Sequence, residues 1–161
     1  MSTRLLKDLE ERAAVATSER ARRELRAQYA GALARLGKIS LARSELLKLR
    51  QENATYEPAL TAWILFAEGL IEHYDSLSAS AQDKFNRAYA IGVGIGDAKL
   101  KCLSGAWIAM CEYQLGNIPK AAGLAREALL GSDPDDHASR SRAHLVAADC
   151  LNTAGDQQGA A

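Results

Sequence analysis

The chain has 161 residues, of which 48% are hydrophobic and only 6% aromatic, and it carries 20 basic and 20 acidic side chains. This length and apolar content suffice for one compact domain or a short repeat array, and the abundance of Ala, Leu, Arg and Glu favours helices. The charged N-terminus lacks the apolar stretch of a secretory signal, and no window reaches the roughly 20 uncharged residues of a membrane helix. We therefore expect an all-α, cytoplasmic protein with no membrane partner.

Charge and cysteine content narrow the function classes further. Residues 1–50 hold 12 Lys and Arg against 6 Asp and Glu, and the remaining residues hold 8 against 14. This asymmetry would suit an acidic partner or head-to-tail association, although the solvated faces of amphipathic helices are the simpler explanation. Cys102, Cys111 and Cys150 are an odd number without CxxC spacing, which indicates reduced thiols and neither a disulfide framework nor a zinc site.

Hydrophobic spacing and capping residues predict eight helices along the chain. In chain order they are expected at 3–16, 19–36, 39–53, 58–74, 79–91, 97–115, 118–130 and 135–154, with a stub after Asp156. Pro58 and Pro119 stand at helix starts, where the missing N–H removes no helical bond. Asp97 and the segment 132–136 supply acceptors for the exposed amides of helix starts.

The first of these helices, at 3–16, precedes the repeated part of the chain and has one apolar side. Leu5, Leu6, Leu9 and Ala13 lie on one side of it at helical spacing. We expect this apolar side either to cover the end of the helix array or to fold back into its groove.

A repeated phrase divides the rest of the chain. The motif LGKISLA at 36–42 recurs as LGNIPKA at 115–121 and, in degenerate form, as AGDQQGA at 154–160. We call the second position of this motif the marker position; Gly37, Ser76, Gly116 and Gly155 occupy it, at intervals of about 40 residues. An alanine follows each marker by five residues (Ala42, Ala81, Ala121 and Ala160), and a small residue precedes each by seven (Ala30, Gly69, Ala109 and Ala148). Small residues let antiparallel helices approach closely, and a left-handed residue at the marker ends the first helix.

Residues 89–129 resemble a tetratricopeptide repeat (TPR), in particular the longer subclass of roughly 40 residues seen in kinesin light chains and in the sensor domain of maltose-type bacterial transcription activators. The matching residues are Ile95-Gly96-Asp97, Leu115-Gly116-Asn117, Ala121 and Ala128-Leu129. The resemblance covers about residues 19–160 and implies an all-α, α-α superhelix, a solenoid of antiparallel helix pairs. A capping helix at 1–18 would precede a repeat domain at 19–161, with units at 19–57, 58–96, 97–134 and a truncated 135–161.

The second unit departs from the family pattern at Ser76 and Glu68, so the register of the helix at 58–74 is open by about two residues. Another helical-repeat class, such as HEAT, is the alternative to TPR.

An apolar stripe on the first helix of each unit is the predicted binding surface. In the resembled family this stripe lines a concave groove that holds an extended peptide or a partner helix. The predicted partner-binding residues are Trp63, Phe66, Leu70, His73, Ala106, Met110, Tyr113, Asp149 and Asn152. If the register of the helix at 58–74 slips by two residues, its bulky side chains form the inter-helix core instead.

Other candidate chemistry is weaker. Gly92, Gly94 and Gly96 match neither a dinucleotide fingerprint nor a P-loop, so we attribute them to helix termination and a flexible turn. His137 and His144 lack further metal ligands at matching spacing. Glu72 and Glu112 recur 40 residues apart and could form an acid/base pair, bind a basic ligand or face water. We expect no catalytic residue, no metal and no cofactor.

The helix at 19–35 is the candidate for nucleic-acid contact. Arg20, Arg22, Arg23 and Arg26 concentrate positive charge there, but Glu19 and Glu24 dilute it. A protein or peptide partner is the preferred hypothesis over a nucleic acid.

Taken together, these patterns predict a non-catalytic protein-interaction scaffold that binds a peptide or partner helix in a TPR groove. Because the last unit lacks a second helix, a homo-oligomer through this open C-terminal repeat is part of the prediction. The alternatives are a ligand-sensing module of a transcription regulator and a fragment of a larger signalling protein.

Overall fold

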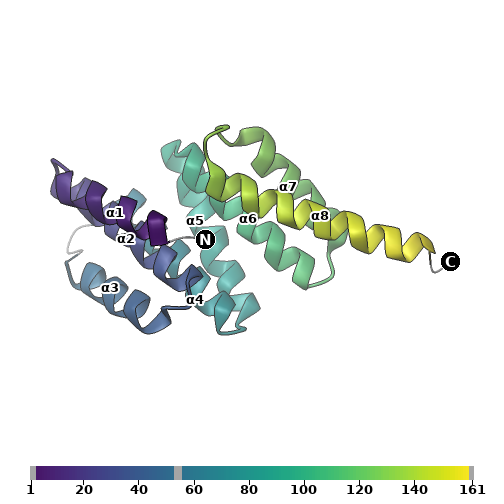
Figure 1. The fold of residues 1–161 in the computed structure, drawn as a ribbon, viewed down its shortest axis with the longest axis horizontal. Coiled ribbons are helices and arrows are strands. Elements are labelled where there is room, and N and C mark those ends of the chain that lie inside the picture. The colour runs from purple at the N-terminus through teal and green to yellow at the C-terminus, as the bar shows by residue number, and fades with distance from the viewer. Residues whose placement is uncertain (1–2, 53–55, 160–161) are drawn as a thin grey trace. The chain divides into compact units, whose positions relative to one another are not determined.

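A computed structural model describes residues 3–52 and 56–159, and within these residues the chain is entirely α-helical between its turns (Figure 1). The eight helices are α1 (Thr3–Val15), α2 (Glu19–Arg35), α3 (Ile39–Glu52), α4 (Pro58–Tyr74), α5 (Ser78–Ile95), α6 (Ala98–Gln114), α7 (Ile118–Gly131) and α8 (His137–Gly159). Within each of the two units described below, consecutive helices pack against one another, so the all-α fold of helix pairs, of the α-α superhelix class, is confirmed.

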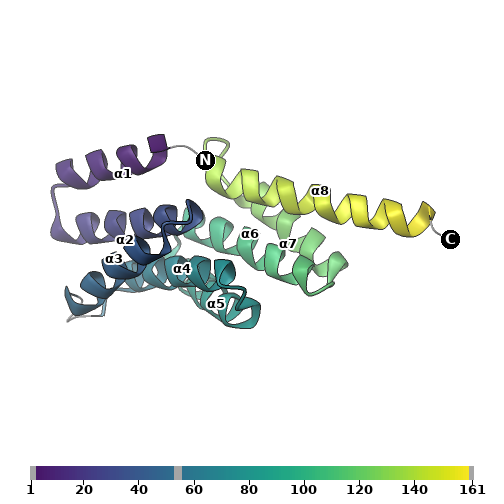
Figure 2. The same cartoon turned by 60° about the horizontal axis from the view of Figure 1, so that its bottom comes forward.

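Two compact units make up the chain, residues 1–91 and residues 92–161. In the first unit α2 contacts α1, α3 and α4, and α1 lies along α2 (Figure 2). In the second unit α6, α7 and α8 all contact one another. In both units, the first helix of a pair therefore packs against its own second helix and against the first helix that follows. No helix among the described residues is long and apolar enough to cross a membrane.

The turns at the repeat markers share one backbone design. Gly37, Ser76 and Gly116 have φ values of 74°, 62° and 82°, in the left-handed region. At each turn the next residue returns a hydrogen bond of 2.9 Å to a carbonyl five residues earlier, as Leu77 N–H does to Glu72. This pattern is the Schellman motif, which ends a helix by satisfying its last carbonyls. Ser76 thus adopts the conformation that the marker position requires.

The capping residues act as the sequence predicts. The Asp97 side chain accepts the Leu100 N–H at 2.9 Å at the start of α6, and the Asp136 side chain accepts the Ser139 N–H at 3.3 Å near the start of α8. These bonds satisfy amides that have no partner inside the helix.

The end of α5 differs from the prediction. The helix continues through Gly92 and Gly94 to Ile95, and of the three glycines only Gly96 takes a positive φ, of 70°. A Cβ atom at Gly92 would lie 3.1 Å from the backbone nitrogen of Lys101, so this glycine permits the close approach of the last turn of α5 and the first turn of α6. Glycine disfavours a helix interior by only about 1 kcal/mol, which such packing offsets.

The end of α8 also differs. The predicted turn at Gly155 is wrong, because α8 continues to Gly159 and Gly155 does not take a positive φ. After Gly37 and Gly116 a second helix packs back on the first, whereas among the described residues no helix follows α8. Without that packing the helical hydrogen bonds simply continue. Ala160, the last member of the alanine column, lies outside the described residues.

The columns of small residues hold helices close together. Ala30, Ala42, Ala81, Ala109 and Ala121 are fully buried. A Cβ atom at Gly69 would lie only 2.7 Å from Cε1 of Phe85, so this position in α4 admits no side chain without displacing the buried Phe85 ring of α5. Ala148 in α8 is the exception, since it is exposed.

Candidate partner-binding surfaces

The predicted apolar stripe on α4 lies in the core of the first unit. Trp63 and Phe66 each keep 4% of their surface, and Leu70 keeps none. The Trp63 and Phe66 rings meet edge to face at 6.0 Å, and Phe66 contacts Phe85 of α5 at 5.5 Å between ring centroids. This packing matches the core alternative for these three residues. His73, one turn farther on, is half-buried beside Tyr74.

In the second unit the predicted residues divide between core and surface. Ala106 and Met110 of α6 are buried in a cluster with α7 and α8. Tyr113 is half-buried, and its hydroxyl lies 3.2 Å from the hydroxyl of Thr153 in α8. Asp149 is half-buried and Asn152 is exposed. The members with surface available to a partner are thus His73, Tyr113, Asp149 and Asn152, and their role in binding stays a prediction.

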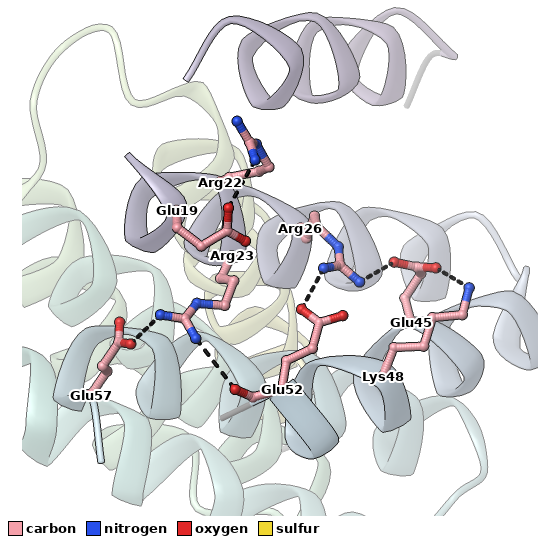
Figure 3. Close-up of polar contacts among 8 residues, drawn as sticks. All are labelled: Glu19, Arg22, Arg23, Arg26, Glu45, Lys48, Glu52 and Glu57. Atoms are coloured by element: carbon pink, nitrogen blue, oxygen red, sulfur yellow. Dashed lines mark hydrogen bonds and ion pairs between the residues drawn. The ribbon is translucent and has the colours of Figure 1, made fainter. Parts of the chain in front are cut away.

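The basic helix α2 is tied to α3 and α4 by ion pairs (Figure 3). The Arg23 guanidinium pairs with Glu57 at the start of α4 and donates to the carbonyl oxygen of Glu52 at 3.4 Å. Arg26 donates to the carboxylates of Glu52 at 2.7 Å and Glu45 at 3.4 Å. The helix therefore uses its cationic face to join three helices.

The charges of this network balance. Arg22 pairs with Glu19 at 2.8 Å, and Lys48 donates to Glu45 at 2.9 Å. Burial alone would raise the pKa of the Glu45 carboxyl, but the hydrogen bond and charge of Lys48, together with Arg26, lower it overall. Since a carboxylate faces each of these cations, they present no concentrated positive potential to a phosphate backbone.

A second polar region lies between α3, α4 and α5. A hollow of about 520 Å³ opens there, lined by Arg43, Leu46, Leu47, Arg50, Glu68, Ile71, Glu72 and Lys84. Glu68, which departs from the family pattern, accepts from Arg50 Nε at 2.7 Å and lies 3.4 Å from Lys84 Nζ. Arg43 pairs with Asp75 at the end of α4. Sequence reasoning singled out Glu68 and Glu72 but not this hollow, because side chains from three helices form it.

A third region is the outer face of α8. Leu145 and Leu151 keep 48% and 73% of their surface, and Ala148 between them is exposed. The positions 39 residues earlier, in α6, are Ala106, Ala109 and Glu112, which keep 0%, 0% and 3%. We call Leu145, Ala148 and Leu151 the outer α8 face; in the part of the chain that the structure describes, no helix covers it.

The cysteines are packed in the interior. All three thiols are free and buried, and burial raises the pKa of each, that of Cys111 to about 11. A thiol is nucleophilic only as its thiolate, so this environment suits packing and not catalysis. Among the described residues no three His, Cys, Asp or Glu side chains gather as a metal site.

Comparison with known proteins identifies no relative: the chain matches no family model, no curated protein and no solved structure.

Proposed function

We propose that the chain is a non-catalytic protein-interaction module of the TPR type, and that its outer α8 face binds a helix of a partner protein. The observation that carries this proposal is the contrast between α6 and α8. The same face is buried in α6 and open in α8, where it displays two leucines around an alanine. Helix pairs of this kind bury apolar surface only against their neighbours, so an open face is a natural docking site.

The packing of α7 on α6 supports a specific kind of partner. Ala121, Ala125 and Ala128 of α7 recur at helical spacing and pack in the cluster that includes Ala106 and Ala109. Lys120 of α7 reaches over α6 to the carboxylate of Glu112, with 2.6 Å between Nζ and Oε1. On α8 the residue corresponding to Glu112 is Leu151, so a complementary helix would carry an apolar residue where α7 has Lys120.

The matching partner is thus an amphipathic helix with a stripe of small residues and one bulky apolar residue. Burying a leucine completely contributes roughly 1.5–3 kcal/mol, and two such side chains give a useful but modest driving force. The proposal includes a cytoplasmic location, which would keep the three buried thiols reduced.

A peptide with the sequence of α7, altered at two positions, tests this function. It spans residues 117–131 with Lys120→Leu, and a lactam bridge between Gly123→Lys and the native Glu127 holds its helix, because short peptides are otherwise largely unfolded. We expect saturable binding to the full chain by fluorescence anisotropy, and loss of binding in Leu145→Arg. The matched control is Leu130→Arg, which changes a 78% exposed leucine of α7 and should leave binding intact.

The same experiment has a second arm for self-association. Light scattering of the chain without peptide measures whether a second copy already occupies the outer α8 face. A dimer that Leu145→Arg dissociates would make the partner helix that of another copy. No peptide binding by a monomeric chain, or binding that survives Leu145→Arg, would contradict the proposal.

A further inference from the structure

Glu72 and Glu112 occupy equivalent positions on the same type of backbone. Each lies near the C-terminus of a first helix, and its carbonyl accepts the returning N–H of the Schellman turn, from Leu77 and from Asn117 respectively, at 2.9 Å in both cases. The residue before the donor has a positive φ at both turns, as Ser76 and Gly116. Any difference between the two carboxylates therefore comes from the side chains around them.

The carboxylate of Glu112 is enclosed by its own unit. Asn117 Nδ2 donates to one oxygen at 2.7 Å, and the Lys120 ammonium donates to the other at 2.6 Å. Glu112 keeps only 3% of its surface. A buried carboxylate needs such donors, because an unpaired charge in the interior is strongly destabilising.

Glu72 has no such donors. The residues that correspond to Asn117 and Lys120 are Leu77 and Ser80, and neither carries an amide or an ammonium group. Oε2 of Glu72 is buried, and no group of the described residues donates a hydrogen bond to it. The side chain lies in the wall of the hollow between α3, α4 and α5.

The charged residues around Glu72 contact one another, and two cations share the carboxylate of Glu68. Glu68 faces Arg50 and Lys84, and Arg43 pairs with Asp75. The hollow also has an apolar part, formed by Leu46 and Ile71, which are buried, and by Leu47, which is exposed. Its wall thus combines apolar surface with a carboxylate whose Oε2 accepts no hydrogen bond from the described residues, the complement of an alkyl chain that ends in an ammonium donor.

We propose that this hollow binds a lysine side chain of a partner protein. The lysine ammonium donates to Glu72 as Lys120 does to Glu112, and its methylene stem lies against Leu46, Leu47 and Ile71. Because a guanidinium has five N–H donors, Arg43 and Arg50 each have donors beyond those used in their ion pairs. In the proposed complex these donors bind the peptide carbonyl groups on either side of the lysine. The volume of about 520 Å³ accommodates this side chain with part of its backbone. The proposal rests on the proposed function as an interaction module but uses a site separate from the outer α8 face.

The test uses N-acetyl-lysine methylamide as the probe. Methyl NMR spectra of the full chain should show saturable shifts at Leu46, Leu47 and Ile71. The norleucine analogue, which keeps the stem without the ammonium, should bind at least about tenfold more weakly, as expected for loss of a charge-assisted hydrogen bond. Equal affinity for n-butylammonium would assign the hollow to free amines and overturn the lysine proposal, as would equal affinity for the norleucine analogue.

Two variants test whether the ammonium group of the probe binds at Glu72. Glu72→Gln removes the charge, and the double variant Leu77→Asn with Ser80→Lys supplies the internal partners that Glu112 has. Both should lose the methyl shifts, whereas Asp83→Asn, which removes an exposed acid of α5 outside the hollow, should keep them. Unchanged probe binding in the double variant would overturn the proposal. Because the α7-like peptide binds elsewhere, its binding to Glu72→Gln reports separately on the proposed function.

Discussion

Ser76 is a serine at a position that glycine occupies in the other marker turns. Its φ of 62° lies in the left-handed region, which is unfavourable for residues with a Cβ by about 1–2 kcal/mol. Ser76→Gly should therefore raise the free energy of unfolding by about 0.5–1 kcal/mol, since the flexibility of glycine in the unfolded chain offsets part of the gain. Urea denaturation measures the change. The reverse exchange, Gly116→Ser, should lower stability, and a destabilised Ser76→Gly variant would contradict the assignment of this turn.

We predict that the Cys111 thiol makes the free energy of unfolding depend on pH in the alkaline range. Burial raises the pKa of its thiol from an ordinary 9.0 to about 11, so the folded state holds the proton more tightly than the unfolded state. The resulting stabilisation is complete below pH 9 and is lost as the pH rises through 11. Cys111→Ala should lose less unfolding free energy than the native chain between pH 8.5 and 10.5, in urea denaturation with reductant present. Parallel losses in the two proteins would show that this thiol does not contribute.

At the scale of elements, the junction of α2, α3 and α4 depends on Arg23. Its side chain and that of Glu57 each keep only 18% of their surface, whereas those of Arg22 and Glu19 keep 45% and 62%. Arg23→Ala should lower the free energy of unfolding by about 2–3 kcal/mol, because it leaves a half-buried carboxylate without its cation. Arg22→Ala, the matched control, should cost about 0.5 kcal/mol or less. Thermal melts of both variants distinguish the two cases, and equal shifts would contradict the structural importance of the Arg23 contact.

Most elements follow from local signals. Asp97 and Pro58 mark helix starts, and Gly37 and Gly116 mark helix ends, because caps and left-handed turns depend on a few adjacent residues. The ends of α5 and α8 were missed for a different reason. Gly92 and Gly155 have the same local preference as the glycines that stop helices, so local signals do not show that the helix continues through them. At Gly92 the first turn of α6 lies close enough to require a residue without a side chain, which only the folded structure reveals.

The whole molecule shows what a repeat pattern can and cannot predict. The period of the markers predicts the helix pairs and their order, since identical turns and small residues recur with it. It does not determine which way Trp63 and Phe66 face, because a helical stripe of bulky residues suits both a core and a groove. The outer α8 face could be found only by comparing burial between equivalent positions, such as Leu145 with Ala106.

The central claim is that the outer α8 face binds a partner helix. Its most direct test is a methyl NMR titration of the chain with the α7-like peptide that carries Lys120→Leu. We predict saturable shifts of the Leu145 and Leu151 methyl groups, with those of Leu130, which is also exposed but lies on α7, unchanged. Shifts confined to residues outside α8, or no shifts at all, would contradict the claim.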